Sequence, residues 1–127
     1  MVYNFTIYYY VVTAVDNTPN ANESANSAEA SGTPEDTTAP AAPTNLTASA
    51  DSDSIALDWD DNTESDLGNY NVYRSTTSGS GYGVIASPTS STYDDTSAEV
   101  GTTYYYVVTA VDNTPNANQS GYSAEAS

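Results

Sequence analysis

The sequence lacks cysteine, histidine and lysine, and Arg74 is its only basic residue. Without cysteine or histidine there is no thiol nucleophile, imidazole base, zinc finger or disulfide. One arginine cannot form the basic surface that a phosphate backbone requires, so we expect no nucleic-acid binding. The same shortage of positive charge argues against attraction to anionic membranes.

Acidic residues dominate the charge, because 17 carboxylates give a formal net charge of −16. Such an excess keeps an exposed polymer soluble. It also suits a protein that binds cations, or one in salty surroundings where ions screen the repulsion. We favour solubility as the role of most of these carboxylates, and cation binding for a single cluster of loop residues.

Long hydrophobic runs are missing as well, and no stretch approaches transmembrane length. Residues Met1–Asn4 lack a basic region, and the tyrosine-rich run after them is not a cleavable signal segment. If the protein is exported, we therefore expect its signal to lie outside this sequence.

An internal repeat organises the chain. Residues Tyr8–Ser31 read YYYVVTAVDNTPNANESANSAEAS, and Tyr104–Ser127 repeat them 96 positions later with three differences. The differing pairs are Glu23/Gln119, Ala25/Gly121 and Asn26/Tyr122. A period of that size matches a whole β-sandwich domain. We predict three parts: residues 1–31 as the last two strands (a hairpin) of a preceding or partner module, residues 32–43 as a Pro/Thr-rich linker, and residues 44–127 as a complete domain.

Seven short runs with strand chemistry follow the linker. In Ser54–Trp59 the apolar residues alternate with outward ones, as in a half-buried strand, and Tyr70 and Val72 share one face of the third run. The runs are Asn45–Ala50, Ser54–Trp59, Asn69–Ser75, Tyr82–Ser87, Ser91–Asp95, Thr103–Asp112 and Tyr122–Ala126. The pattern predicts an all-β, seven-stranded antiparallel sandwich.

These runs resemble the fibronectin type III family over Ala39–Ser127. The resemblance is carried by a proline-rich beginning (APAAPTNLTAS), a tryptophan at the end of the second run (IALDW) and NYNVYR in the third. It implies an immunoglobulin-like (fibronectin type III) sandwich, here preceded by an extra β-hairpin. It also implies that Tyr104 is the tyrosine-corner residue, whose hydroxyl reaches the backbone across the preceding turn. The segments NTESDLGNYNVYRSTTSG and YYYVVTAVD are similar to segments of bacterial and archaeal surface proteins that contain tandem repeats.

The resemblance implies a secreted or cell-surface protein that is not an enzyme. We expect a structural repeat of an extracellular fibre, filament, stalk or adhesin, in contact with copies of itself or neighbouring like modules. The alternative is an accessory module of a secreted enzyme that binds carbohydrate or protein. The integrin-binding tripeptide Arg-Gly-Asp is absent, since Ser75 follows Arg74. No cofactor is required, and we expect no catalysis because the carboxylates lie mainly on loops without a cleft.

The first copy of the repeat has no sheet partner in this sequence. A lone hairpin is marginally stable in water, and its inward residues would expose an apolar patch. Two explanations stay open: a truncated upstream domain, or a hairpin that is donated to a sandwich of another chain. The residues of this assembly face are Tyr8, Tyr10, Val12 and Ala14.

Acidic loops at one end of the predicted sandwich form a candidate calcium site. Alternating strand directions bring the linker, the loop after Trp59 and the loop after the sixth run to the same end. Calcium prefers six to eight oxygen ligands, which these loops offer. The candidate ligands are Asp36, Asp60, Asp61, Glu64, Asp66, Asp112 and Asn113. An ion there would stiffen the linker; the alternative is a set of solvated turn residues.

Two further surface features are candidates. Outward Tyr73 and Tyr105 could stack on a sugar ring, or could simply stabilise the sheet as a cross-strand aromatic pair. Four Asn-X-Ser/Thr sequons are candidate glycosylation sites if the source glycosylates exported proteins. They begin at Asn4, Asn22, Asn45 and Asn118.

Overall fold

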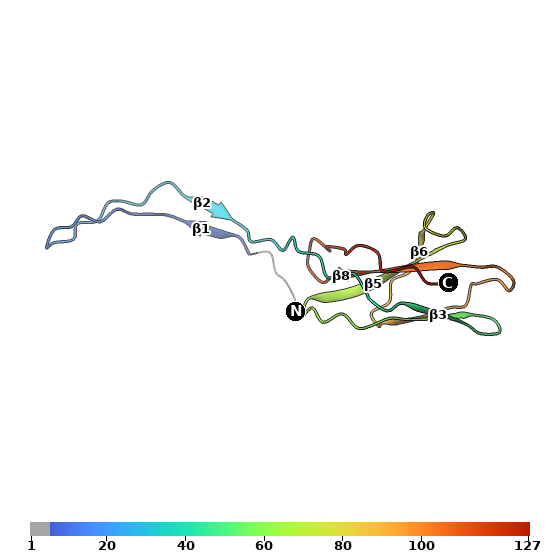
Figure 1. Cartoon of the computed structure of the whole chain (residues 1–127). Coiled ribbons are helices and arrows are strands. Elements are labelled where there is room, and N and C mark those ends of the chain that lie inside the picture. The colour runs from blue at the N-terminus through green and yellow to red at the C-terminus, as the bar shows by residue number, and fades with distance from the viewer. Residues whose placement is uncertain (1–5) are drawn as a thin grey trace. The chain divides into compact units, whose positions relative to one another are not determined.

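The computed structural model describes residues 6–127, which form two units, each described by itself. Residues 37–127 form a β-sandwich, and residues 6–36 form a smaller unit that contains a hairpin. The regular secondary structure of residues 6–127 is entirely β-strand (Figure 1). No helix in this part of the chain is long and apolar enough to cross a membrane. The predicted all-β class is confirmed.

Two antiparallel sheets of three strands make up the sandwich (Figure 1). The first has the order β3-β4-β7, with bounds Thr47–Ala50, Ile55–Asp58 and Thr92–Asp95. The second has the order β6-β5-β8, with bounds Gly83–Ala86, Leu67–Ser75 and Tyr105–Asp112. In both sheets strands from distant parts of the sequence are neighbours, which is the connectivity expected of an immunoglobulin-like sandwich.

The last predicted strand runs along β8 at the expected edge position, but as isolated bridges. Ala126 lies opposite Tyr106, and Gln119 lies opposite Val111. Between these bridges the amides of Val108 and Ala110 donate to the hydroxyl oxygens of serines, at 3.0 and 2.9 Å. Serine hydroxyls therefore replace backbone carbonyls as acceptors, which keeps the segment bound without a regular ladder.

The core lies between the two sheets and is aromatic at its centre. Leu57 and Trp59 come from β4 and its end, and their exposed fractions are 2% and 3%. The facing sheet contributes Tyr70, Val72, Tyr104, Tyr106, Val108 and Ala110. The rings of Trp59 and Tyr70 pack edge to face at 5.3 Å, a favoured aromatic geometry. The alternation of the sequence therefore predicts this interior correctly.

The turn before β8 contains the predicted tyrosine corner. The backbone amide of Glu99 donates to the hydroxyl of Tyr104 at 3.2 Å, across the turn that includes Gly101 at φ +86°. The corner therefore forms although Ala98 and Val100 stand where the family usually has leucine and proline.

The smaller unit is a two-stranded hairpin. β1 (Tyr8–Tyr10) pairs antiparallel with β2 (Ala30–Gly32), and Tyr10 lies opposite Ala30. Farther along, Val15 forms a bridge with Glu23. Residues 8–32 are called the N-terminal hairpin below, and residues 104–127 the C-terminal hairpin.

Candidate functional site

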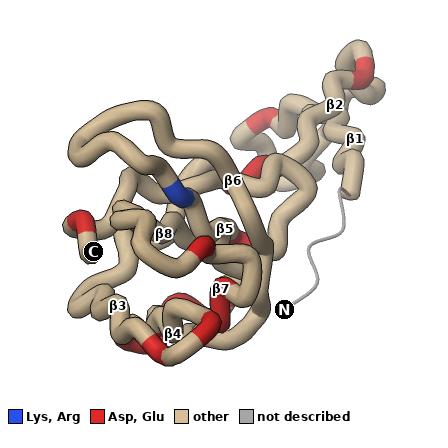
Figure 2. Tube along the Cα trace, turned by 90° about the vertical axis from the view of Figure 1, so that its right-hand side faces the viewer, with Lys and Arg blue, Asp and Glu red and all other residues tan. Residues whose placement is uncertain are grey.

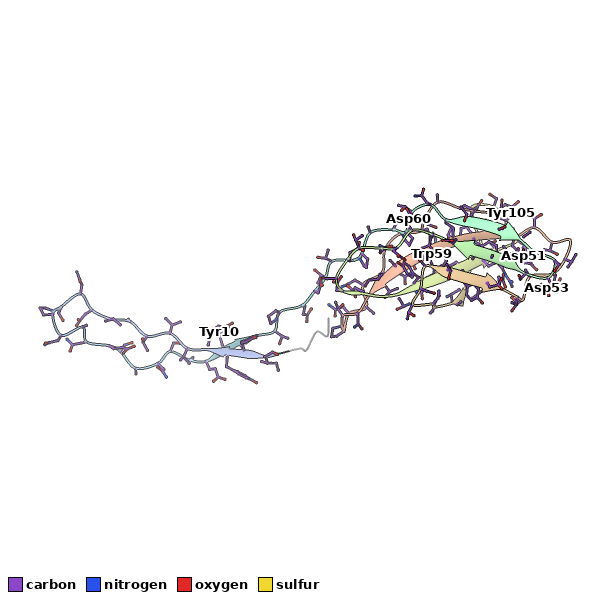
Figure 3. All side chains as sticks on the ribbon, turned by 90° about the horizontal axis from the view of Figure 1, so that it is seen from below. Tyr10, Asp51, Asp53, Trp59, Asp60 and Tyr105 are labelled. Atoms are coloured by element: carbon purple, nitrogen blue, oxygen red, sulfur yellow. The ribbon has the colours of Figure 1, made fainter. Side chains whose placement is uncertain are left out.

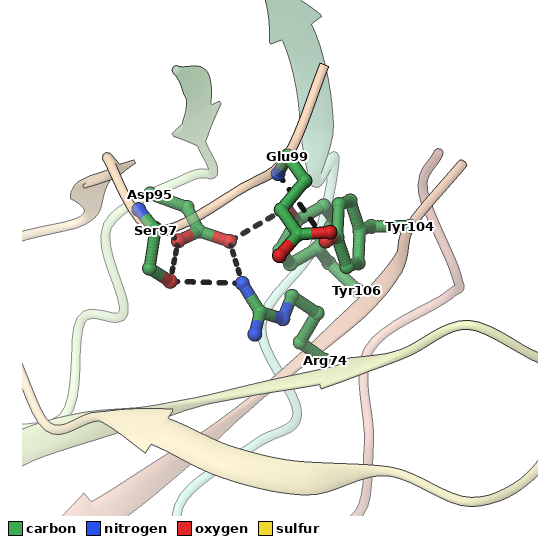
Figure 4. Close-up of polar contacts among 6 residues, drawn as sticks. All are labelled: Arg74, Asp95, Ser97, Glu99, Tyr104 and Tyr106. Atoms are coloured by element: carbon green, nitrogen blue, oxygen red, sulfur yellow. Dashed lines mark hydrogen bonds and ion pairs between the residues drawn. The ribbon is translucent and has the colours of Figure 1, made fainter. Parts of the chain in front are cut away.

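A polar cluster around Asp95 closes one end of the sandwich core. Asp95 is fully buried on β7, and its Oδ2 accepts a hydrogen bond from the Arg74 guanidinium at 2.9 Å (Figure 4). The Tyr106 hydroxyl donates to the same oxygen at 2.8 Å. The amide and hydroxyl of Ser97 donate to Oδ1 at 3.1 and 2.7 Å. Every oxygen of this buried carboxylate is thus hydrogen-bonded, which such burial requires.

Arg74 joins the two sheets through this cluster. It is the single Lys or Arg of the chain and gives the one blue segment in Figure 2. Its guanidinium also donates to Ser97 Oγ at 2.9 Å and lies 4.6 Å from the centre of the Tyr104 ring. The only cation of the chain is therefore used to hold the fold, and not to bind an external anion.

Burial and hydrogen bonding shift the ionisation of the cluster in opposite directions. Burial alone would raise the pKa of Asp95. Hydrogen bonds from Ser97, Tyr106 and Arg74, together with the charge of Arg74, hold the pKa of Asp95 below its ordinary value. Burial, and then the bond to Asp95, raises the pKa of Tyr106. Asp95 therefore stays ionised and Tyr106 protonated at neutral pH.

Sequence reasoning missed this cluster, although the period of β5 contained a signal. Tyr70, Val72 and Arg74 alternate along one strand, so Arg74 had to point inward with the other two. A buried arginine needs an acidic partner. Which of the 17 carboxylates serves as that partner depends on the pairing of distant strands, which the alternation does not specify.

The linker is fastened to the sandwich by the loop that follows Trp59. Glu64 Oε1 accepts a hydrogen bond from the amide of Ala41 at 2.6 Å. Asn62 Nδ2 donates to the carbonyl oxygen of Ala41 at 2.8 Å and to Glu64 Oε2 at 3.0 Å. The hydrogen bond from Ala41, despite partial desolvation, lowers the pKa of Glu64. The predicted meeting of linker and loop is thus achieved by direct hydrogen bonds.

Other members of the predicted calcium set have separate partners. Asp60 Oδ2 accepts from Asn45 Nδ2 at 2.6 Å, and Asp61 Oδ1 accepts from the Ser91 hydroxyl at 2.5 Å. Asp36 belongs to the hairpin unit. Asp60, Asp61 and Glu64 are therefore engaged by protein donors at three different places.

Asp66 and Asp112 do come together. A carboxylate oxygen of Asp66 lies within 4.8 Å of a carboxylate oxygen of Asp112. The amide of Asn113 donates to the carbonyl oxygen of Asp66 at 2.5 Å, which ties the loop after β8 to the loop before β5. Gly68 permits this approach, because a Cβ there would lie 3.0 Å from the carbonyl oxygen of Asp112. Calcium binding by this set stays a prediction, and a rise in melting temperature at millimolar calcium would test it.

Asp112 organises the turn of the C-terminal hairpin. Its Oδ1 accepts from the amide and hydroxyl of Thr114 at 3.3 and 2.7 Å, and from the amide of Asn118 at 2.9 Å. Asn118 Nδ2 donates to Oδ2 at 2.8 Å. Burial opposes ionisation, but these hydrogen bonds lower the pKa of Asp112. The same turn recurs in the N-terminal hairpin, where Asp16 bonds to Thr18 and Asn22 in the same pattern.

The four residues predicted for the assembly face are all exposed in the N-terminal hairpin. The exposed fractions of Tyr8, Tyr10 and Val12 are 49%, 60% and 70%. Figure 3 labels Tyr10 on this unit and Trp59 inside the sandwich. Assembly through this face stays a prediction.

The outer face of the β6-β5-β8 sheet carries an aromatic cluster. Tyr122 packs edge to face on Tyr73 at 5.2 Å and on Tyr82 at 5.5 Å. The Tyr73 hydroxyl accepts a hydrogen bond from Gln119 Nε2 at 2.7 Å, and the Tyr82 hydroxyl donates to Glu125. Sequence reasoning placed Tyr73 and Tyr105 together on this face, but the ring of Tyr73 packs on Tyr122, which lies on the irregular last segment. Sugar binding by Tyr73 and Tyr105 stays a prediction.

The sequon asparagines of the described residues already donate hydrogen bonds through their side chains. Asn22 and Asn118 bond to the aspartates of their hairpin turns, and Asn45 bonds to Asp60. Asn4 lies outside the described residues. Glycosylation of these four positions stays a prediction.

The sandwich offers two shallow hollows, one at each end. One lies between the β3–β4 turn (Asp51 and Asp53 in Figure 3) and the turn 98–102. The other lies between the linker at Ala41 and the loop 61–64. The sequence supplies neither histidine nor cysteine for either one. The geometry defines a class of protein: a small immunoglobulin-like β-sandwich.

Comparisons with known proteins place the chain within that class. No family model matches it. Exoglucanase B of Cellulomonas fimi is 36% identical over 118 residues, which cover 87% of this chain and 10% of that enzyme. An amylopullulanase of Thermoanaerobacterium saccharolyticum is 37% identical over 87 residues, 67% of this chain and 7% of that enzyme. The chain thus spans a tenth or less of the length of these curated relatives.

A solved structure gives the family. The Fn3-like protein from Clostridium thermocellum is 44% identical, covers 70% of this chain and 91% of its own, and superposes with a TM-score of 0.61. This chain belongs to the fibronectin type III family, and its sandwich is a non-catalytic module.

Proposed function

We propose that this chain is a non-catalytic accessory module of a multidomain, exported polysaccharide-degrading enzyme, in which it spaces neighbouring modules. The observation that carries the proposal is the match to exoglucanase B, which covers 87% of this chain and only 10% of the enzyme. That share of the chain is larger than residues 37–127 alone can supply, so the similarity reaches into the N-terminal unit. A module that forms a small part of a large enzyme suits a spacer.

The bonded linker supports the spacing role. Asn62 and Glu64 hold both the amide and the carbonyl of Ala41, within a stretch whose prolines already favour extended backbone. Such a junction limits the directions in which a preceding module can point. A spacer needs this stiffness more than it needs a cleft.

The fibre function that the sequence suggested has less support. Of the two forms of such a fibre, tandem modules or a donated hairpin, the second would need each sandwich to accept the hairpin of another chain. In this structure β8 pairs with β5 along its whole length, from Leu67–Asp112 to Ser75–Tyr105. An exchange of one hairpin for a near-identical one buries no additional surface, so a homopolymer gains little free energy by this route.

The experiment uses the full chain and follows hydrogen exchange of the Ala41 amide. We expect that amide to be protected, and Glu64→Ala to accelerate its exchange while the melting temperature of the sandwich changes little. Asp53→Ala, a carboxylate in the opposite end of the sandwich, is the matched control. Unprotected exchange of Ala41 in the unmodified chain would contradict a stiff junction.

Co-sedimentation with insoluble cellulose and granular starch separates spacing from carbohydrate binding. A spacer stays in the supernatant with both polymers. If the chain sediments, and Tyr122→Ala abolishes sedimentation, the accessory function is carbohydrate binding through the aromatic cluster instead.

A further inference from the structure

The two hairpins differ only at positions that lie away from the sandwich core. The residues that fill the core in the C-terminal hairpin have identical counterparts in the N-terminal one: Tyr104/Tyr8, Tyr106/Tyr10, Val108/Val12 and Ala110/Ala14. All three differing pairs fall in the second half of the hairpin. The N-terminal hairpin therefore presents the same core face with a different outer face.

Two of the differing positions contact the outer face of the sheet. Gln119 Nε2 donates to the Tyr73 hydroxyl at 2.7 Å, and Tyr122 packs on the rings of Tyr73 and Tyr82. Asn26, the counterpart of Tyr122, has no ring to make these contacts. The third position is sterically silent, because a Cβ at Gly121 meets nothing within 4 Å.

The hydrogen-bond polarity also changes at one position. Gln119 Nε2 donates to Thr109 Oγ1 at 2.9 Å, whereas Glu23 Oε1 accepts from Thr13 Oγ1 at 2.5 Å. A neutral donor in one hairpin is thus a carboxylate acceptor in the other. A surface that faces Glu23 should offer a donor, and a tyrosine hydroxyl such as that of Tyr73 can serve, because a phenol both donates and accepts.

An intact second copy of this chain is a poor occupant for the exposed face. Its five strands β3–β7, called the scaffold here, already hold the C-terminal hairpin with all of the contacts above. The N-terminal hairpin would have to displace it and would lose the ring contacts of Tyr122. The occupant must be a scaffold with an open position and a different outer face.

We propose that the N-terminal hairpin completes the five-strand scaffold of a different type III sandwich. The residues at positions 23 and 26 of this hairpin differ from their equivalents at 119 and 122 of the C-terminal hairpin, and these differences direct each hairpin to its own scaffold. The partner scaffold lacks the ring pair formed here by Tyr73 and Tyr82, which is the main difference at position 26, and it offers a hydrogen-bond donor to Glu23. In an array of modules with near-identical hairpins, these two positions prevent exchange between neighbours. The inference is independent of the proposed spacing function.

The test uses the full chain with the C-terminal hairpin damaged. A110D places an unpaired carboxylate at a fully buried position, so the scaffold loses its own hairpin. In A110D/E23Q/N26Y the N-terminal hairpin carries the matched residues and should fill the scaffold. We expect its folded-to-unfolded ratio to exceed that of A110D by about tenfold, because the two ring contacts of a tyrosine at position 26 are gained. Fluorescence of Trp59, buried only in the folded sandwich, measures the ratio.

Two controls and one further measurement fix the outcome. A110D/A25G changes the silent position and should behave like A110D, and adding A14D to A110D/E23Q/N26Y should abolish the rescue. If A110D and A110D/E23Q/N26Y fold equally, positions 23 and 26 direct nothing. If deuterium exchange shows that protection stays on residues 119–127 in A110D/E23Q/N26Y, or if that variant is as unfolded as its A14D form, the docking itself is overturned.

Discussion

The N-terminal and C-terminal hairpins are the same local structure in two different surroundings. Tyr10 lies opposite Ala30 in one, and Tyr106 lies opposite Ala126 in the other. The turns share a residue at φ +47°, Ala21 and Ala117. Yet the exposed fraction is 60% for Tyr10 and 0% for Tyr106.

The comparison separates what the local sequence determines from what packing adds. Register, turn and serine–backbone hydrogen bonds recur in both copies, so the repeated segment itself specifies them. Burial exists only where a scaffold supplies the other half of the core. Since most of the stability of a sheet comes from what covers it, matched substitutions in the two copies should have very different effects.

The largest contrast is expected at the central tyrosine. Tyr106→Ala removes a fully buried ring and a hydrogen bond to Asp95, and should lower the free energy of unfolding of the sandwich by about 4 kcal/mol. Tyr10→Ala should change it by less than about 0.5 kcal/mol. Urea denaturation followed by Trp59 fluorescence measures both. A comparable loss in the two variants would mean that the N-terminal hairpin is also part of the folded core.

The second-largest effect is expected at the cluster of Arg74 and Asp95, which has no counterpart in the N-terminal hairpin. Arg74→Met keeps the stem of the side chain but leaves Asp95 buried with no cation, which should cost about 3 kcal/mol. Arg74→Lys is the informative control, because a point charge restores the ion pair but not both bonds of the guanidinium nitrogen. If Arg74→Met were as stable as the parent, the hydrogen bonds from Ser97 and Tyr106 alone would be sufficient to stabilise the buried carboxylate of Asp95.

The pH dependence should follow from the lowered pKa of Asp95. A carboxylate with a folded pKa below its unfolded value, about 3.9, adds stability that is complete above that value and is lost as the pH falls through the folded pKa. Protonation of other carboxylates relieves the repulsion within this acidic chain over a similar range. The difference in unfolding free energy between the parent and Asp95→Asn isolates the one residue. We expect that difference to be constant above about pH 5 and to shrink below about pH 4.

A constant difference down to pH 2 would contradict a lowered pKa for Asp95. Denaturant melts of the parent and of Asp95→Asn at several pH values provide the measurement, and Asp53→Asn, a substitution in an exposed loop, is measured beside them.

Sequence alternation was sufficient for the core but not for its polar end. The alternation in Ser54–Trp59 and the shared face of Tyr70 and Val72 were read from the sequence, because period-two patterns assign each side chain to a face. The pairing of Arg74 with Asp95 joins two sheets, and no local pattern specifies that choice. The ring contact of Tyr122 with Tyr73 was missed for a similar reason, since the last segment follows serine hydroxyls instead of a ladder.

For the candidate sites, the sequence predicted which loops meet but not which groups their carboxylates bind. The acidic loops do meet the linker, as strand direction predicted, but Glu64 receives a backbone amide and Asp60 a side-chain amide. Oxygen-rich loops that resemble a cation site in sequence can equally be satisfied by the many Asn, Ser and Thr donors of this chain. Only the arrangement in space separates the two outcomes.

The smallest contrast is expected at the serines that support each hairpin. Ser123 Oγ accepts from the buried amide of Val108 at 3.0 Å, so Ser123→Ala should lower the free energy of unfolding by about 1 kcal/mol. Ser27→Ala removes the same bond to Val12, but water can replace the hydroxyl there because both groups are exposed. It should leave the stability of the sandwich unchanged within about 0.5 kcal/mol. If Ser123→Ala were also silent, the hydroxyl would not be what holds the last segment to β8. The bridges at Gln119 and Ala126 and the amides of Ser120 and Ser123, which donate to carbonyl oxygens of β8, would then be sufficient.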